Sequence, residues 1–278
     1  MQLIPKKSLG QHFLNSRHVL EQIIQAADIK VGEIILEIGP GTGFLTDALL
    51  HAKANVVAIE KDDRAFELLQ EKYSDQISNK KLKLIKGDIL DLKIADLLKS
   101  SDFPAPTTEN ESKIADYSIV ANIPYYITGA ILQKFLEEDY RPKRMVLLVQ
   151  KEVADRIVAH DNKESILSVS VKAFGSPKIA QRVPRGAFTP PPSVESAILC
   201  IENINNERFT SNNVEISTFF KIVKSGFAHK RKFLMRNLEQ AMEASKIKDI
   251  WQRLNLNEKI RAEDLKLEDW FRISVLIK

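Results

Sequence analysis

Five consecutive residues, Asn122-Ile123-Pro124-Tyr125-Tyr126, combine groups that could bind a flat base with an exocyclic amine. The Asn122 side-chain oxygen can accept a hydrogen bond from an amino group. The Tyr125 ring can stack on a heterocycle, and Pro124 fixes its own φ angle and restricts Ile123, which stiffens the turn. We therefore interpret this stretch as a base clamp. The alternative is an ordinary strand end with a proline turn and a core tyrosine.

A buried strand must position this clamp. Residues 117–121 form an apolar run directly before it, which is typical of a core strand. The clamp would then lie at the carboxyl edge of a sheet, where open α/β folds bind their ligands.

A glycine-rich turn indicates a cofactor site at the same edge. Glu37, Gly39, Gly41 and Gly43 follow an apolar strand and precede a helix at residues 44–50. Gly39 and Gly41 allow the backbone to approach a ligand closely. Glu60 ends the next strand, about 20 residues beyond the glycines, where an acid binds ribose hydroxyls. The alternative is a structural turn and a solvated glutamate.

The spacing of this turn favours S-adenosylmethionine over a dinucleotide. It differs from the Gly-x-Gly-x-x-Gly spacing that binds pyrophosphate, which disfavours a nicotinamide-dependent oxidoreductase. Asp88 follows a third strand at 82–86 and could accept a hydrogen bond from an adenine amine. Carboxylates on successive strand ends would repel a pyrophosphate but suit a cationic ligand. No metal site is expected.

Phe188 begins a stiff segment, Phe-Thr-Pro-Pro-Pro, at residues 188–192. Such an arm could hold the Phe188 ring opposite Tyr125 as a second wall of the base pocket. The alternative is a linker whose phenylalanine belongs to the core.

The order of patterns predicts two domains. About seven strands, with helices between the early ones and a surface insertion at 100–115, indicate an α/β domain over residues 1–204. Residues 205–278 show only helical periodicity and are expected to form a small helical domain. A basic turn between two of its helices suits RNA phosphates, although it could also be a solvated loop. It contains Lys230, Arg231 and Lys232, and Arg236 lies close by in the sequence.

Composition agrees with a soluble globular protein: 44% of the 278 residues are apolar, 28% are charged, and the net charge is +4. The single cysteine, Cys200, lies in an apolar run and is expected in the core of a protein from a reducing compartment. No apolar run approaches a membrane span, and no signal-peptide core is visible at the amino terminus. A cytoplasmic protein is therefore expected.

Taken together, these motifs resemble those of the ribosomal RNA adenine dimethyltransferases, specifically the bacterial small-subunit, KsgA-type members. The resemblance covers nearly the whole chain. It rests on Lys-Ser-Leu-Gly-Gln-His-Phe-Leu at 7–14, the glycine turn, Gly-Asp at 87–88, Asn-Ile-Pro-Tyr at 122–125, Gln-Lys-Glu at 150–152, Phe-Thr-Pro-Pro-Pro, the basic 229–236 stretch and Arg-Ala-Glu at 261–263.

The resemblance implies a Rossmann-like methyltransferase domain and a helical carboxyl-terminal domain. It also implies contacts to S-adenosylmethionine from His12, Leu14, Gly39, Glu60, Asp88 and Asn122. The implied substrate is a pair of adjacent adenines in a hairpin loop near the 3′ end of small-subunit (16S) rRNA. Each adenine receives two methyl groups on its exocyclic nitrogen, and a monomer acting on the small ribosomal subunit or its precursor is expected.

We hypothesise that the target adenine is flipped from its loop and stacked on Tyr125. The Asn122 side-chain oxygen and the Ile123 carbonyl would accept the two amine hydrogens and orient the lone pair. Two rivals stay open: an RNA-binding ribosome assembly factor with dispensable catalysis, and an adenine methyltransferase that acts on large-subunit rRNA.

Overall fold

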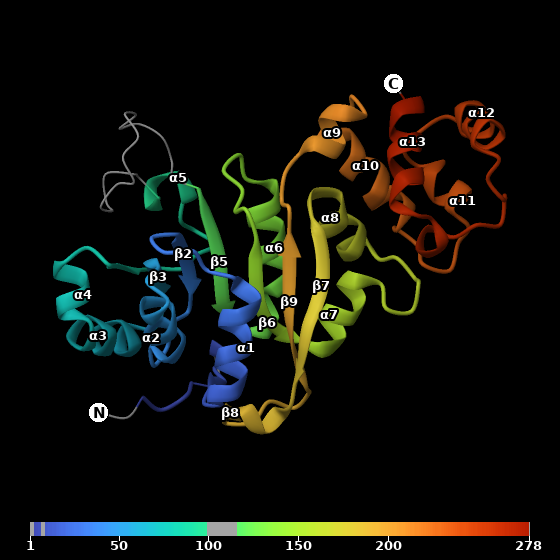
Figure 1. The fold of residues 1–278 in the computed structure, drawn as a ribbon. Helices are drawn as coiled ribbons and strands as arrows, with labels where there is room; N and C mark the ends of the chain where they lie inside the picture. Colours follow the sequence, from blue (N-terminus) through green and yellow to red (C-terminus); the bar gives the residue numbers. More distant parts are fainter. Residues whose placement is uncertain (1–2, 7–8, 99–115, 278) are drawn as a thin grey trace, which may run out of the picture. The chain divides into compact units, whose positions relative to one another are not determined.

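The computed structural model describes residues 3–6, 9–98 and 116–277. Lys7 and the expected insertion at 100–115 lie outside the described residues. The chain divides into two compact units (Figure 1). The first contains Met1–Ala154 and Lys178–Ile204, and the second contains Asp155–Pro177 and Asn205–Lys278. The second unit thus contains a segment, Asp155–Pro177, that the sequence analysis placed in the first domain.

A seven-stranded sheet forms the centre of the first unit, in the order β4-β3-β2-β5-β6-β9-β7. Strands β4, β3, β2, β5 and β6 pair in parallel, and β9 runs antiparallel to β6. This confirms the predicted Rossmann-like α/β fold with a mostly parallel sheet. The strands are β2 (Ile34–Ile38), β3 (Asn55–Glu60), β4 (Leu82–Lys86), β5 (Tyr117–Asn122), β6 (Met145–Gln150), β7 (Ser176–Val183) and β9 (Ser196–Glu202).

The central strands could be recognised from sequence because both of their faces are covered. All five residues of β2 and all six of β3 are buried. Strands of this kind appear as continuous apolar runs rather than alternating ones. Cys200 in β9 is 1% exposed, so the prediction that it is a core residue is confirmed.

The first helix of the first unit begins at a side-chain cap. Ser16 accepts a hydrogen bond from the Val19 backbone N–H and starts the first helix, which buries Val19, Ile23 and Ala27 along one face. The helices are α1 (Arg17–Ala27), α2 (Phe44–His51), α3 (Asp63–Lys72), α4 (Ser74–Ser78), α5 (Ile94–Leu97) and α6 (Thr128–Glu137), with the short turns η3 (Tyr125–Ile127) and η4 (Arg185–Ala187). Helix α7 (Lys151–Val158) spans the division between the units.

The strand β7 was not assigned from sequence. Its side chains are mostly exposed, so no apolar run marks it. The apolar residues just before it form instead a helix, α8 (Ile166–Phe174), which begins at a capping box between Ser165 and Ser168. Helix α8 packs against α9, α10 and α13 and therefore belongs to the second unit.

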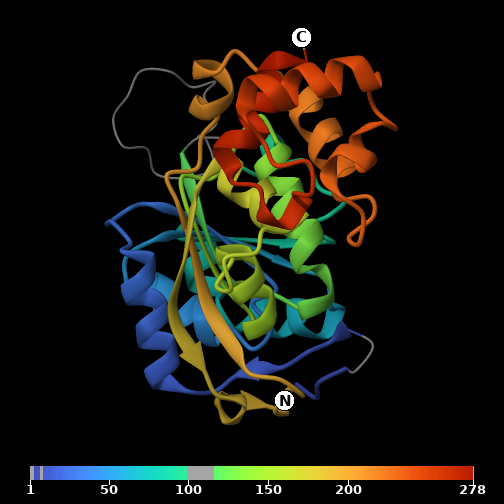
Figure 2. The same cartoon turned by 90° about the vertical axis from the view of Figure 1, so that its right-hand side faces the viewer.

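The amino-terminal segment is tied to the proline-rich segment by a second, two-stranded sheet. Strand β1 (Phe13–Leu14) pairs antiparallel with β8 (Phe188–Thr189), as the blue and ochre arrows near the N label of Figure 2 show. This pairing joins residues about 175 positions apart in the chain and carries His12 to the carbonyl of Pro190, where Nδ1 and O are 2.8 Å apart.

The second unit is helical in its carboxyl-terminal part. Its helices after α8 are α9 (Glu207–Ser211), α10 (Ile216–Gly226), α11 (Leu234–Leu238), α12 (Ala244–Leu254) and α13 (Leu267–Leu276), with the turn η5 (Ala262–Asp264). An aromatic cluster packs between them, formed by Phe174, Phe209, Phe219, Phe220 and Phe271 with ring centroids 4.5 to 6.4 Å apart. Among the described residues, no helix has the length and apolarity needed to cross a membrane.

The predicted basic turn lies between α10 and α11. The Asn237 side chain, 1% exposed, donates to the backbone carbonyls of Gly226 (2.6 Å) and His229 (3.1 Å). These two hydrogen bonds fix the backbone where the turn leaves α10 and where the basic residues begin. The basic side chains themselves are exposed.

Gly226 gives a test of the packing in this unit. A Cβ there would lie 2.4 Å from the Trp270 ring and 2.9 Å from Leu234. We expect Gly226→Ala to lower the free energy of unfolding by about 1–3 kcal/mol, because the buried indole must shift. Gly129→Ala in α6 is the control, since a Cβ there meets nothing within 4 Å. Chemical denaturation measures both, and equal stabilities of the two variants would contradict this packing.

Candidate functional site

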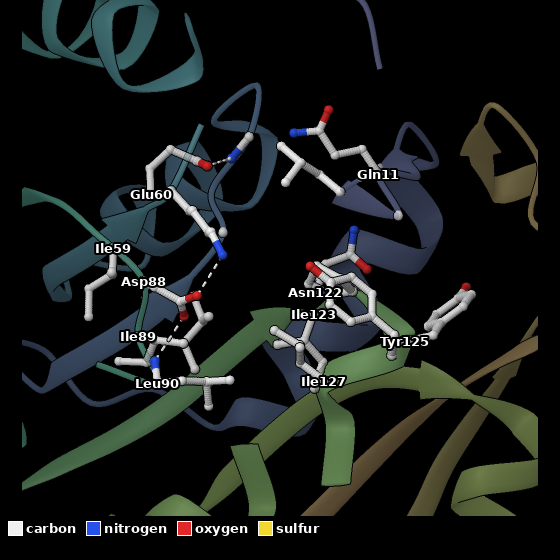
Figure 3. A pocket seen from close by; sticks show the side chains of 18 of the residues that line it. Gln11, Ile59, Glu60, Asp88, Ile89, Leu90, Asn122, Ile123, Tyr125 and Ile127 are labelled. Carbon is white, nitrogen blue, oxygen red and sulfur yellow. Dashed lines mark hydrogen bonds and ion pairs between the residues drawn. The ribbon is translucent and has the colours of Figure 1, made fainter. Parts of the chain in front are cut away.

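A pocket lies at the carboxyl ends of β2, β3, β4 and β5 in the first unit. Its walls come from residues 9–13, 59–61, 87–90 and 122–127, together with Ile38, Gly39 and Gly41. Figure 3 shows the acids Glu60 and Asp88 on one side and Asn122 and Tyr125 on the other. The parallel sheet thus brings together the ends of four strands, as expected for an open α/β fold.

The glycine turn after β2 adopts the left-handed conformation that glycine favours. The φ angle is 66° at Gly39 and 57° at Gly41. A Cβ on Gly39 would meet nothing within 4 Å, so its bare backbone faces open space that a ligand can enter. A Cβ on Gly41 would lie 2.9 Å from the Phe13 ring. Gly39 therefore leaves room for a ligand, whereas Gly41 leaves room for the amino-terminal segment.

Glu60 fastens this turn to the end of β3. Its Oε2 accepts from the Gly41 backbone N–H at 3.0 Å and its Oε1 from the Asp62 N–H at 2.8 Å. Burial raises the pKa of the Glu60 carboxyl, and these backbone hydrogen bonds oppose the rise. Sequence reasoning assigned Glu60 only a role toward ribose; the structure shows that its carboxyl group sets the shape of the glycine turn.

Asp88 is paired with Lys61, a pocket residue that sequence reasoning missed. The Lys61 Nζ lies 2.7 Å from Asp88 Oδ2, and the Leu90 backbone N–H donates to Asp88 Oδ1 at 2.9 Å. The hydrogen bond and charge of Lys61 hold the pKa of the Asp88 carboxyl below its usual value. Asp88 is therefore a carboxylate that can accept at the pocket wall. Lys61 belongs to a run of charges at the start of α3, a pattern that is also typical of a solvated helix end.

The orientation of the Asn122 amide is fixed by its partner. Its Nδ2 donates to the backbone carbonyl of His12 at 3.1 Å. A carbonyl oxygen can only accept, so the nitrogen must face it and Oδ1 must take the other position. The amino-terminal segment thus holds the Asn122 oxygen ready as an acceptor.

Tyr125 is held by two residues from distant parts of the chain. Its hydroxyl lies 2.6 Å from the Oγ of Ser196, which is fully buried at the start of β9. Its ring stacks on His12 with centroids 5.9 Å apart and planes inclined by 19°. Burial raises the pKa of the Tyr125 hydroxyl. The ring is thereby fixed in position beside Asn122.

Asp62 anchors the amino-terminal wall of the pocket. This carboxylate is buried and accepts hydrogen bonds from Gln11 at 3.2 Å and from Lys6 at 3.5 Å. Arg64 Nη2, 2.6 Å away, contributes most to a pKa of Asp62 well below its usual range. Neither Gln11 nor Asp62 was identified from sequence, because no spacing rule links residues about 50 positions apart.

Several residues assigned from sequence are not among those that line the pocket. Phe188 is 2% exposed and belongs to the hydrophobic core, as does Leu14, and neither side chain lines the pocket. The structure therefore places Phe188 where the alternative interpretation had it, in the core. Lys230, Arg231, Lys232 and Arg236 are exposed in the second unit, and Arg236 pairs with Glu239 at 3.2 Å. Within the part of the chain that the structure describes, no group of three or more His, Cys, Asp or Glu side chains could hold a metal ion.

Comparison with known protein families gives a match over almost the whole chain. The family model described as "Ribosomal RNA adenine dimethylase" matches residues 4–278. A Dehalococcoides mccartyi protein named "Ribosomal RNA small subunit methyltransferase A" is 38% identical over 270 residues, covering 96% of this chain and 87% of the relative. A Crocosphaera subtropica protein of the same name is 35% identical and covers 97% of both chains.

Solved structures share the fold. A dimethyladenosine transferase from Plasmodium falciparum superposes with a TM-score of 0.75 and 27% identity, covering 94% of this chain and 96% of that one. The 23S rRNA methyltransferase ErmE superposes with a TM-score of 0.71 at 22% identity, covering 96% and 100%, which supports the fold alone. Because the family model and the curated relatives both match across nearly its full length, the chain belongs to the ribosomal RNA adenine dimethylase family.

Proposed function

We propose that this protein transfers methyl groups from S-adenosylmethionine to the exocyclic amines of two adjacent adenines near the 3′ end of small-subunit (16S) rRNA. The observation that carries the proposal is the fixed Asn122 amide, whose oxygen is left as an acceptor beside the Tyr125 ring. Family membership supports the same reaction. The proposed partner is the small ribosomal subunit or its precursor, met by a monomer in the cytoplasm.

The pocket walls fit S-adenosylmethionine. The bare backbone at Gly39 leaves space for the ligand, and Asp88 and Glu60 offer carboxylates at neighbouring strand ends. Ile59, Ile89 and Leu90 supply apolar wall beside them, which suits a purine ring. When bound, the cofactor supplies an electrophilic methyl carbon on a positively charged sulfur. Gly39, Glu60 and Asp88 are the residues that we assign to hold it, with His12 fixing the nearby wall.

The chain's own residues would make the adenine amine reactive by orienting it. This amine is a poor nucleophile because its lone pair is delocalised into the ring. The Asn122 Oδ1 and the Ile123 carbonyl accept the two amine hydrogens, which directs the lone pair out of the ring plane. The same oxygens stabilise the positive charge that develops on the nitrogen. An amide is not a general base, so the released proton passes to solvent after the new N–C bond has formed. Pro124 and Tyr125 keep this geometry stiff.

Transfer of labelled methyl groups to unmethylated small ribosomal subunits, followed by nucleoside analysis, tests the proposal. We expect dimethyladenosine in the small-subunit rRNA. Label in large-subunit rRNA would point to the rival methyltransferase. Binding to the particle with no transfer would overturn the enzymatic role and favour a ribosome assembly factor.

The basic turn between α10 and α11 is proposed as a contact to RNA phosphates. Lys230, Arg231 and Lys232 are exposed, and Asn237 fixes the backbone that carries them. A fixed turn loses little conformational freedom when its cations meet phosphates.

Replacing Lys230, Arg231 and Lys232 with glutamine should weaken RNA binding and make it less dependent on salt. Removing three phosphate contacts should reduce the slope of log affinity against log salt by about 2–3. The matched control replaces Lys248, Lys259 and Lys266, three exposed lysines of the same unit, and changes net charge equally. Filter binding at several salt concentrations measures both. The same slope in the two triple variants would contradict a specific role for the turn.

A further inference from the structure

Tyr126 is an exposed aromatic residue at the pocket that the proposed reaction does not use. Its side chain is 64% exposed, yet it contributes to the pocket wall. Tyr140, another exposed tyrosine in the described part of the first unit, is 48% exposed and contributes nothing to this wall. A large aromatic ring that is exposed beside a binding pocket is available for a base to stack on.

The Tyr126 ring is held in place by its own turn and by the backbone of Gly10. It belongs to η3, which is closed by hydrogen bonds from the Ile127 N–H to the Pro124 carbonyl (3.2 Å) and from the Thr128 hydroxyl to the Tyr125 carbonyl (3.1 Å). A Cβ on Gly10 would lie 3.3 Å from two ring carbons of Tyr126. The ring therefore packs on the bare backbone of Gly10, whose φ of 59° also favours glycine. An ordered ring loses little entropy when a base stacks on it.

Tyr125 and Tyr126 differ in how much of each side chain is free to contact a ligand. The Tyr125 hydroxyl is bound to Ser196 and its ring stacks on His12, whereas most of the Tyr126 side chain is exposed. Their Cα atoms are about 3.8 Å apart, as in any trans peptide. The two rings thus start from neighbouring points on the pocket wall, and one substrate strand can reach both.

We propose that Tyr126 is a stacking site for the nucleobase next to the target adenine in the RNA strand. This inference rests on the proposed function. Flipping one base out of a stacked loop removes a stacking partner from its neighbour, and an exposed ring at the pocket can replace that partner. In a substrate with two adjacent target adenines, the neighbour is the second adenine, which Tyr126 would hold while the first occupies the pocket.

The rival occupant of this ring is the adenine of the cofactor. The apolar pocket residues Ile59 and Ile89 are only 2% and 3% exposed, so they form an inner wall for an enclosed ligand. Tyr126 is exposed and lies at the rim, which suits a strand that arrives from solvent. We therefore favour the RNA base.

The test combines variants of the full-length protein with RNA hairpins that carry an abasic site beside the target adenine. Tyr126→Ala should weaken binding of the intact hairpin by roughly 5- to 150-fold, the range of 1–3 kcal/mol per stacked base at 1.4 kcal/mol per tenfold. Tyr126→Phe should bind as the wild type does, and Tyr140→Ala is the matched control. The abasic hairpin should bind Tyr126→Ala and wild type equally, because the stacking partner is already absent.

Three results would overturn the inference. Tyr126→Ala could bind the intact hairpin as tightly as wild type, or the losses from the variant and from the abasic site could add independently. A loss of cofactor affinity in Tyr126→Ala, measured by calorimetry without RNA, would assign the ring to the cofactor instead. If the wild-type protein failed to methylate the intact hairpin and the small subunit, the proposed function would fail, whichever way Tyr126 behaved.

Discussion

Asn122→Ala is expected to lower the rate of methyl transfer by about 100- to 1000-fold, the effect of removing one preorganised polar group from the site of developing charge. The alanine keeps the strand β5 but removes the oxygen that would accept an amine hydrogen. RNA binding should change far less, because the variant keeps Tyr125 and the basic turn, to which we assign base stacking and phosphate contacts. Single-turnover transfer with saturating cofactor and RNA separates the chemical step from binding.

The variant also removes the hydrogen bond from Asn122 Nδ2 to the His12 carbonyl, which is worth about 1 kcal/mol. Cofactor affinity must therefore be measured alongside transfer. Asn79→Ala, at an exposed asparagine outside the pocket, is the matched control and should transfer at the wild-type rate. Equal losses in transfer and in RNA or cofactor affinity would show that Asn122 only holds the site together.

The fold could be predicted largely because its signals are local. Short, mostly apolar segments mark strands such as β2 and β3. Strand β7 lacks such a signal because most of its side chains face solvent. The pairing of β1 with β8 is invisible in sequence for a different reason: each strand has two residues and shows no periodicity.

The pocket was predicted in outline because parallel strands must end at one edge of the sheet. Glu60, Asp88 and Asn122 each end or follow a predicted strand, and the structure brings all three to one pocket. Contacts between distant segments were not predictable. The ion pair of Lys61 with Asp88 and the bond of Tyr125 to Ser196 depend on how the chain folds back on itself. Phe188 shows the converse, since a rigid proline segment can carry its ring into the core as well as into a pocket.

Glu37→Gln is expected to remove a large pH dependence from the stability of the protein. Glu37 lies in β2 with 1% of its side chain exposed, and burial raises its pKa to about 8. Its Oε2 is 2.7 Å from the Thr46 hydroxyl, while its Oε1 has no hydrogen-bond partner among the described residues. The folded protein therefore favours the neutral acid, as a carboxyl group does when water is withdrawn from it.

The direction of the pH effect follows from proton binding. Between the unfolded value near 4.5 and the folded value of about 8, the folded state holds a proton that the unfolded state has lost. Stability from this group is thus complete below pH 4.5 and is lost as the pH rises toward 8. At 1.36 kcal/mol per pH unit, the loss over these roughly 3.5 units amounts to about 5 kcal/mol. Glutamine has nearly the same shape and does not ionise, so the variant should not lose this stability as the pH rises.

Denaturation of wild type and Glu37→Gln from pH 5 to 8.5 measures this effect as a difference in slope, which cancels the contributions of other titrating groups. The variant should gain stability over the wild type as the pH rises, whereas Glu71→Gln, at an exposed glutamate of α3, should follow the wild type. Parallel curves for wild type and Glu37→Gln would show that Glu37 is ionised in the folded protein, with water or a cation reaching it. The expected result would instead mean that Glu37, which precedes the glycine turn, is protonated and neutral in the folded protein. The strand that leads into the pocket would then add no negative charge to the carboxylates of Glu60 and Asp88.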